Sequence, residues 1–375
     1  ADRFLGGRGI ATRIYWEEVL PGTGAFDPEN LLIFMTGPLV ATGTQGAARC
    51  MVTGKSPMLM PEGFCYGNIG SFFGPYLKRA GYDGLIIHGR SNKPVYLLIH
   101  DQNIQIHDAS SLWGKGVYAA SNILKNEYGK RITFILTGVA GDNLCRSANL
   151  MTENDGSVTG GFGAVFGSKN LKAIAVMGSG GPSIAQPDKL KELNKRVYHL
   201  CQGPAKTDSA RLETSVSAKT AHCYQCAIDC EFRIVARAAS GKDMIGMCQA
   251  MFVYHEWIVD RNDEPEEAAF DATRLCNDLS ICTMEMYNII AWLDACFTSG
   301  YPMPKETGLH IEELGRLSFF EKLADMIAYR KGFGDILAEG LLRTGEKLGE
   351  KARAHFSDEV SDVGGAAEYS GRAYL

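Results

Sequence analysis

Hydrophobic residues in the first half of the chain occur in short runs that are separated by glycine-rich turns. Runs of about four to eight such residues, bounded by turn residues, are typical of β-strands. The runs are NLLIFMTG (30–37), DGLIIHGR (83–90), KPVYLLIHD (93–101), IQIHD (104–108), ITFILTGVAG (132–141) and LKAIAVMG (171–178). We therefore predict a sheet-rich region up to about Gly178, in which only VYAASNILKNEYG (117–129) has helical spacing.

The pattern changes after the stretch GSGGPSIAQPDK (178–189), where hydrophobic residues begin to recur at helical spacing. One such stripe consists of Met286, Ile290, Leu293 and Phe297. We predict an α+β fold with a β-rich domain at residues 1–182 and an α-helical domain at residues 183–375.

Two helices of the second half carry apparent start signals. Ser318 followed by Glu321 predicts a capping box for FFEKLADMIAYRKG (319–332). Asp335 predicts a cap for ILAEGLLRTGEKLG (336–349). Each predicted helix ends near a glycine, as helices commonly do.

Composition and charge exclude several classes of protein. The net charge of −5 is spread along the chain without a basic tract, so a nucleic-acid partner is not expected. No hydrophobic run reaches the roughly 18 residues of a membrane span, and no secretion signal is visible at the start of the sequence. The 11 cysteines are an odd number in a long chain, which favours a reducing, cytoplasmic location over a disulfide framework.

Three cysteines stand close together in HCYQCAIDC (222–230). Cys223, Cys226 and Cys230 bring three thiolates to one point, as an iron–sulfur cluster or a tetrahedral zinc ion requires. Zinc held by the three thiolates with His222 or His255 is an alternative, and cysteines that meet by chance in a helical core are another. Either metal centre, cluster or zinc, needs one more protein ligand or an open coordination position.

Glycine-rich segments recur through the sheet-rich half, and glycines let backbone amides approach phosphates or a flat ring closely. The segments are GGRG (6–9), GTQGAAR (43–49), GNIGSFFG (67–74) and TGGFGAVFGSKN (159–170). None is a dinucleotide-binding or P-loop motif, so nicotinamide and nucleotide cofactors are not expected. Tight turns alone would explain many of these glycines.

Taken together, the order of these segments resembles the aldehyde:ferredoxin oxidoreductase family of tungsten enzymes. The matching text includes LGGRGIATRIYWEEV (5–19), PENLLIFMTGPL (28–39), FFGPYLKRAGYDGLIIHGR (72–90), GFGAVFGSKNLKAIAV (161–176), CYQCAIDC (223–230) and GFGDILAEG (332–340). The resemblance implies a β-rich domain that holds tungsten between two pyranopterins. It also implies helical domains beside a [4Fe-4S] cluster.

The resemblance assigns the first three cluster ligands to Cys223, Cys226 and Cys230. The family's fourth ligand lies far downstream, in a stretch that this sequence lacks, so we expect a partial or divided chain that by itself holds its cluster poorly. Other cysteines are candidates for the fourth ligand, and their spacing favours none of them. They are Cys248, Cys276, Cys282 and Cys296.

In the cofactor half, the resemblance assigns Arg49 to a position between pterin and cluster, where a fixed cation stabilises added electrons. Asn68 and Gly70 match residues whose backbone lies on the pterin and its bridging Mg²⁺, a hard cation that suits carbonyl oxygen. Ser71 replaces a family glycine. A further family arginine, before the segment GGFGAV (160–165), is missing, which puts part of the phosphate clamp in doubt.

The catalytic half departs more from the family. Cys248 stands where many members have a glutamate close to tungsten, and a thiolate there would ligate the metal, as in the benzoyl-CoA reductase branch. The family's E-x-x-H pattern reads Asp271 to Arg274, so the carboxylate is shortened and the histidine is lost. The resemblance makes Asp271 a candidate catalytic residue, and an interface iron is not expected. His255 is a candidate proton donor to substrate, although a structural role is the plainer interpretation.

The family's second pterin motif, D-x-x-G-x-D, has the counterparts Asn277, Ser280 and Cys282. Asn277 retains hydrogen-bonding groups for a pterin edge, whereas Cys282 loses an acceptor. The resemblance implies oxidation of an aldehyde to a carboxylate, with electrons passing through the cluster to ferredoxin or an iron–sulfur subunit of an oligomer. A low-potential reductase of an aromatic acyl-CoA and a cluster-only electron-transfer module are the alternatives.

Overall fold

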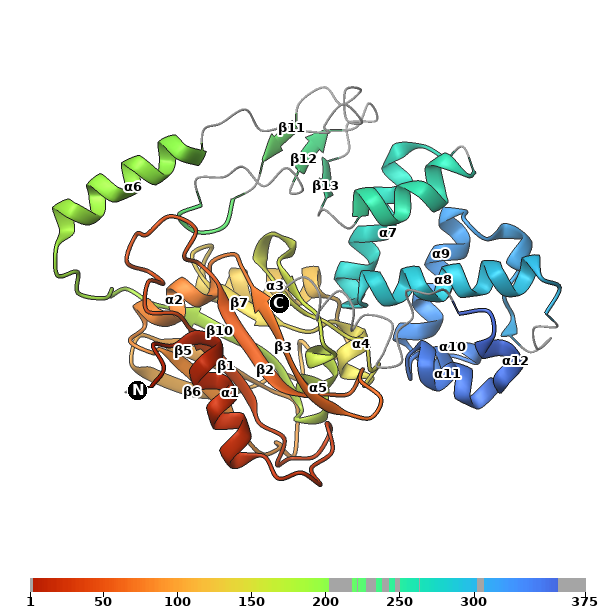
Figure 1. Cartoon of the computed structure of the whole chain (residues 1–375), viewed down its shortest axis with the longest axis horizontal. Coiled ribbons are helices and arrows are strands. Elements are labelled where there is room, and N and C mark those ends of the chain that lie inside the picture. Colours follow the sequence, from red (N-terminus) through yellow and green to blue (C-terminus); the bar gives the residue numbers. More distant parts are fainter. Residues whose placement is uncertain are drawn as a thin grey trace.

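The computed structural model describes residues 3–201, 218–220, 222–226, 234–237, 243–246, 250–262, 264–301 and 307–356. Two sheets lie in the first half and a group of helices in the second (Figure 1). The predicted α+β fold is thereby confirmed. A small antiparallel sheet in the second half was not predicted; its strands are β11 (Ala218–Thr220), β12 (Ile234–Arg237) and β13 (Asp243–Gly246).

The first sheet is antiparallel and has the strand order β3-β2-β1-β4. Its strands are β1 (Leu32–Thr36), β2 (Cys50–Ser56), β3 (Gly63–Ile69) and β4 (Gly84–Ile87). Helix α1 (Gly7–Glu18) covers one face, where Ala11 packs on Ile33 and Met35. The opposite face carries Leu32 and Phe34, because successive side chains of a strand alternate between faces.

The second sheet has the order β6-β5-β10-β7-β8-β9, and only β10 and β5 run parallel. Its strands are β5 (Val95–His100), β6 (Asn103–Asp108), β7 (Thr133–Leu136), β8 (Leu150–Thr152), β9 (Ser157–Val158) and β10 (Leu171–Met177). One face shares a core with the first sheet, and the other is covered by α3 (Val117–Tyr128). Central strands are thus buried on both faces, which explains their continuous hydrophobic runs.

The prediction that 117–129 is the only helical stretch of this half is wrong. Alongside α3 the structure contains α1, α2 (Phe73–Arg79), α4 (Val139–Asp142), η1 (Glu153–Asp155) and α5 (Phe162–Ser168). Strands β2 and β3 were also missed. Most of these helices are too short to show a clear 3.6-residue period, and glycines interrupt α1, α2 and α5.

The second half is built mainly from helices packed in one large core. They are the π-helix η3 (Ala250–Asp260), α7 (Glu266–Leu279), α8 (Thr283–Thr298), the 3₁₀ turn η5 (Ile311–Glu313), α9 (Leu317–Ala328), α10 (Phe333–Leu337), α11 (Leu341–Leu348) and α12 (Glu350–Arg353). This core includes Val139, Ala148 and Ala164 of the sheet half. The two halves therefore share buried hydrophobic surface. Helix α6 (Pro187–Cys201) lies outside it, with no buried residue (Figure 1).

The stripe on α8 is confirmed for Met286, Ile290 and Leu293, which are buried, but Phe297 is 54% exposed. Both capping predictions are wrong. Helix α9 begins after Arg316 without a side-chain cap, so Ser318 lies inside the helix. Asp335 lies within α10, and the predicted helix 336–349 is divided at Gly340, whose φ of 90° breaks the helical path.

Candidate cofactor and cluster site

The loop 222–226, which carries two of the predicted cluster cysteines, lies on the sheet half. Tyr224 N donates to the carbonyl of Ser71 at 3.3 Å, and Gly46 N donates to the carbonyl of Gln225 at 2.9 Å. The ring of Tyr224 meets that of Phe72 edge to face, with centroids 6.2 Å apart. Residues about 150 positions apart in sequence are therefore held together by main-chain hydrogen bonds and one aromatic contact.

Cys223 and Cys226 belong to one turn, because Cys226 N donates to the carbonyl of Cys223 at 3.2 Å. Both thiols are partly exposed. Among the residues that the structure describes, no group of three or more His, Cys, Asp or Glu side chains is arranged to hold a metal ion. Cys230 lies outside the described residues, as does Cys248, so the three-cysteine cluster stays a prediction.

The sulfur of Cys223 lies against the end of strand β3. A Cβ on Gly70 would be 2.9 Å from this sulfur and 4.0 Å from the guanidinium carbon of Arg49, so a larger residue there would have to displace the Cys223 side chain. The register of β2 and β3, which pairs Cys50 with Ile69 and Met51 with Asn68, explains why Arg49 and Gly70 meet. Arg49 and Cys223 thus both lie close to Gly70, and their roles toward a pterin and a cluster stay predictions.

Ser71 is fully buried and has a φ of 68°, in the left-handed region. Its N–H donates to the sulfur of Cys223 at 3.3 Å. Asn68 is half-buried on β3, three residues before Ser71. The structure therefore brings Arg49, Gly70, Ser71 and Cys223 together, with Asn68 on the adjoining strand.

The turn 277–282, which carries the second predicted pterin motif, also lies on the sheet half. Ser280, with a φ of 65°, ends helix α7. Its Oγ accepts a hydrogen bond from Gly138 N at 2.6 Å, and its carbonyl accepts one from Asn149 N at 2.7 Å. Cys282 N donates to the carbonyl of Ser147 at 3.2 Å, so three hydrogen bonds fix this turn on the loop 137–149.

Two amide groups at this turn fit a polar ligand. Nδ2 of Asn277 and Oδ1 of Asn149 are buried without a hydrogen-bond partner. A buried polar atom without a partner costs free energy, on the order of 1–3 kcal/mol, that a bound ligand with complementary groups would recover. The donor and acceptor match the edge of a pterin, so the residues present fit the cofactor that the sequence resemblance implied.

The buried cysteines of the helical half differ from Cys223. Burial raises the pKa of Cys276 to about 12 and that of Cys282 to about 11, which keeps both thiols protonated at neutral pH. Burial also raises the pKa of Cys296 to about 11. Metal ligation requires the thiolate, which a bound metal itself can generate, so the fourth cluster ligand stays a prediction.

Of the three predicted catalytic residues, Cys248 lies outside the described residues, and His255 and Asp271 lie on neighbouring segments. His255 is on η3, and its Nδ1 lies 3.2 Å from Oδ1 of Asp260 without hydrogen-bond geometry. Asp271 is half-buried on α7. η3 packs against α7, with the hydroxyl of Tyr254 donating to the sulfur of Cys276 at 3.4 Å. Their roles toward a substrate stay predictions.

A polar cluster beside the turn was not found from the sequence. Oδ1 of Asp278 accepts from Tyr118 N at 2.8 Å, at the start of α3, and the guanidinium of Arg274 lies 4.7 Å from the ring centre of Tyr118. Beneath it, Nζ of Lys172 and Oδ2 of Asp142 form a fully buried ion pair at 2.6 Å. These residues connect α7 with α3 and β10 across the two halves.

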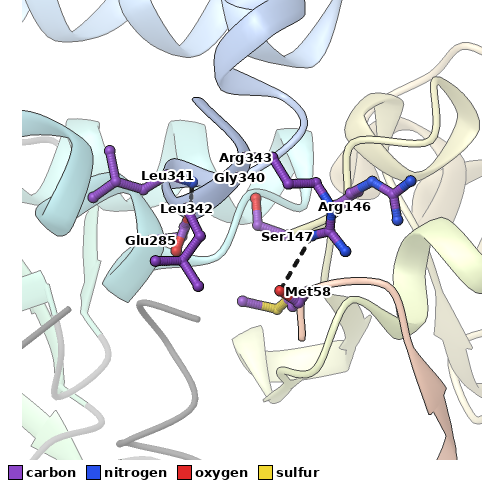
Figure 2. Close-up of a pocket in the computed structure, with 8 residues that line it drawn as sticks. All are labelled: Met58, Arg146, Ser147, Glu285, Gly340, Leu341, Leu342 and Arg343. Carbon is purple, nitrogen blue, oxygen red and sulfur yellow. Dashed lines mark hydrogen bonds between the residues drawn. The ribbon is translucent and has the colours of Figure 1, made fainter. Parts of the chain in front are cut away.

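A second contact between the halves surrounds a cavity of about 10 Å³, with room for about one water molecule (Figure 2). Arg146 bridges Glu62 at 2.6 Å and Glu339 at 2.7 Å. Arg343 donates to the carbonyls of Met58 and Leu59. The charged side chains of this region are paired with protein groups, which indicates that the region has a structural role in connecting the two halves.

Family models match nearly the whole chain. The model for the aldehyde ferredoxin oxidoreductase N-terminal domain matches residues 1–178, and the model for aldehyde ferredoxin oxidoreductase domains 2 and 3 matches residues 185–367. None of the described helices has the length and hydrophobicity to cross a membrane.

Among curated proteins, the chain is similar to the tungsten-containing aldehyde ferredoxin oxidoreductases of Pyrococcus furiosus (31% identity) and Pyrococcus abyssi (32%). Each alignment covers 93% of this chain and 64% or 63% of the relative, so the chain spans less than two thirds of their length. The P. furiosus aliphatic sulfonate oxidoreductase, WOR-like subunit, is 37% identical over 52% of this chain and 34% of its own length.

Among solved structures, the chain is similar to the active-site complex BamBC of benzoyl coenzyme A reductase in complex with 1,5-dienoyl-CoA. The TM-score is 0.82 at 25% sequence identity. The match covers 94% of this chain and 60% of that chain.

Proposed function

This chain belongs to the aldehyde ferredoxin oxidoreductase family, and on that premise we propose that it is a tungsten bis-pyranopterin oxidoreductase with a [4Fe-4S] cluster. Its reaction is the oxidation of aldehydes to carboxylic acids. The electrons leave through the cluster to ferredoxin or an iron–sulfur partner subunit of a cytoplasmic oligomer. The relatives named tungsten-containing aldehyde ferredoxin oxidoreductases support the metal, the substrate class and the acceptor.

One observation carries the proposal: the contact of Arg49, Gly70 and Cys223. It brings a predicted cluster ligand within 2.9 Å of the Cβ position of a predicted pterin-binding residue. A cluster at Cys223 and a cofactor at Gly70 would then be neighbours, with the Arg49 cation between them. Electron transfer needs this closeness, and the positive charge stabilises added electrons in either group.

The chain's own residues take the following roles. Cys223, Cys226 and Cys230 would hold the cluster; Arg49, Asn68, Gly70 and Ser71 would bind the first pterin; and Asn277, Ser280 and Cys282 would bind the second. The backbone at Asn68 and Gly70 would offer a carbonyl oxygen to Mg²⁺. The bound cofactors supply two-electron or oxygen-atom transfer at tungsten and single-electron transfer at the cluster. The division into domains at 1–182 and 183–375 is part of the proposal and is supported by the ranges 1–178 and 185–367 of the family models.

The substrate is expected to bind beside the helical half. His255 donates a proton to it, and Asp271 supplies a carboxylate on the neighbouring helix α7. Both side chains are partly buried, so they retain access to a small molecule.

A second candidate is a low-potential reductase of an aromatic acyl-CoA. The similarity to the benzoyl-CoA reductase complex, at a TM-score of 0.82, favours it. In that case Cys248 is a tungsten ligand. Electrons would then pass from the cluster to the substrate, which is the reverse of their direction in aldehyde oxidation.

The test begins with metal analysis of the protein purified anaerobically together with any partner chain, because the chain by itself is expected to hold its cluster poorly. Roughly one tungsten and four irons per chain are expected. Viologen dyes then follow the reaction, as acceptors with aldehydes and as donors with benzoyl-CoA. Tungsten-containing protein without either activity contradicts both substrates. Iron without tungsten identifies an electron-transfer module, and zinc alone a structural site.

A further inference from the structure

Ser71 occupies a backbone conformation that serine rarely adopts. Its φ of 68° lies in the left-handed region, where a residue with a Cβ is less stable than glycine by about 1–2 kcal/mol. The residue is also completely buried. Contacts of the side chain therefore have to offset this strain.

The contacts come from Glu153, in the 3₁₀ turn η1 that follows strand β8. Oγ of Ser71 lies 2.9 Å from Oε1 of Glu153 and 3.0 Å from its carbonyl oxygen, and it donates its proton between them. The same Oε1 accepts from Phe72 N at 3.1 Å and from Oγ1 of Thr133 at 2.8 Å. Oε2 accepts from Phe134 N at 3.2 Å.

Glu153 is thus surrounded by neutral donors from two other segments, the loop 71–72 and strand β7. Hydrogen bonds to a carboxylate are stronger than those between neutral groups, which makes this arrangement rigid. The rigid side chain fixes the main chain of Ser71 on its opposite side. There the N–H faces the sulfur of Cys223, and the carbonyl accepts from Tyr224 N.

We propose that Ser71 and Glu153 are positioning residues that hold the N–H of Ser71 on the Cys223 sulfur and so raise the reduction potential of the cluster. An N–H donor withdraws negative charge from a ligating sulfur, which stabilises the reduced cluster. The inference rests on the proposed function, since it requires a cluster at Cys223. The N–H of Ser71 is then a second determinant of the cluster's reduction potential, separate from the positive charge of Arg49.

The test compares Ser71→Gly and Glu153→Gln with wild type in the full-length holoenzyme. Glycine keeps the left-handed backbone and the N–H but loses the anchor, and glutamine removes the charge that orders the donors. A spectroscopically monitored redox titration is expected to give a more negative midpoint potential in both variants. Ser183→Gly, at an exposed position of the link before α6, is the matched control and should leave the potential unchanged.

An unchanged potential in both variants, with four irons still bound, overturns the inference. If a variant loses iron, its positioning role is tested in the iron-free full chain instead. Hydrogen exchange of the peptide that contains residue 71 is then compared between the variant and wild type. Faster exchange than in wild type supports the positioning role, and equal exchange overturns it. Wild-type protein that binds no iron even when it is purified with its partner chain contradicts the proposed function instead, and the exchange comparison still tests the Ser71–Glu153 anchor.

Discussion

The loop 222–226 and the turn 277–282 both join the second half of the chain to the sheet half, but their polar groups differ. At the loop, Glu153 satisfies the donors around Ser71, and the Cys223 sulfur receives an N–H. At the turn, Ser280 is fixed by main-chain donors, while the amide atoms of Asn277 and Asn149 stay without partners.

The difference indicates two kinds of binding. The loop places a thiol in contact with a donor and a cation, which suits coordination of a metal centre whose charge is tuned by its surroundings. The turn offers a rigid frame with an unused donor and acceptor, which suits a neutral polar ring recognised by hydrogen bonds. Changes at the loop should therefore act on iron and potential, and changes at the turn on stability and pterin retention.

The largest effect is expected from Cys223→Ser. A serine oxygen is a poor ligand for iron, so the variant should lose nearly all of its cluster iron while it retains tungsten. Iron and tungsten analysis by mass spectrometry measures both. Cys201→Ser, on α6, is the control and should retain iron. Equal loss of both metals in the Cys223 variant would mean that loop and turn do not act separately.

Lys172→Met should give the largest loss of stability near the turn. It leaves the Asp142 carboxylate buried without its cation, at a cost of about 3–5 kcal/mol in the free energy of unfolding. Urea denaturation measures this cost. Lys93→Met, which breaks an exposed ion pair with Asp108, should have a much smaller effect, because water screens an exposed pair. Similar losses in both variants would contradict a specific role for the buried pair.

Gly138→Ala tests the contact of the turn itself. An added Cβ would lie 2.4 Å from the carbonyl oxygen of Asp278 and 2.7 Å from the carbonyl carbon of Leu279, and neither backbone atom can move easily. Overpacking of this kind costs about 1–3 kcal/mol, and the shifted turn should retain less pterin. Gly22→Ala, where a Cβ meets nothing within 4 Å, is the control and should be within about 0.5 kcal/mol of wild type. Full pterin content in Gly138→Ala would contradict a role of the turn in cofactor binding.

A fold element could be predicted from the sequence where its pattern is local, and not where it depends on contacts between residues distant in sequence. Strands β1, β5 and β10 were recognised because burial on both faces gives long hydrophobic runs. Helix α1 was missed, since it begins at a glycine without a side-chain cap. The break at Gly340 was missed because a positive φ leaves no mark beyond the glycine itself.

The site residues show the same limit. The family resemblance named Arg49, Gly70 and Cys223, and the structure brings them together. Glu153 and Asp278 carried no recognisable signal, because each acts through main-chain donors that are distant in sequence. Only the pairing of β7 with β8 and the docking of α7 on α3 reveal these contacts.

The smallest effect is expected at Asp278. The pH dependence of the free energy of unfolding distinguishes the contribution of its charge from that of its hydrogen bond. Burial raises the pKa of Asp278 above its ordinary value of 3.8, so the folded chain favours the protonated acid. Its contribution to stability is fully present below pH 3.8 and is lost as the pH rises through the raised pKa. Asp278→Asn keeps an acceptor for Tyr118 N without a charge and should lack this loss. Unfolding free energies between about pH 4 and about pH 7 measure it.

Asp278→Ala is the matched variant for the hydrogen bond, because it removes the acceptor at the start of α3. Relative to Asp278→Asn, it should be less stable by about 1 kcal/mol at every pH, as expected for the loss of a helix cap, because neither variant titrates at this position. If asparagine and alanine behave alike, the hydrogen bond to Tyr118 contributes nothing measurable. The turn would then be held by the hydrogen bonds of Ser280 and Cys282 to residues 138–149, and its difference from the carboxylate-anchored loop would be sharper still.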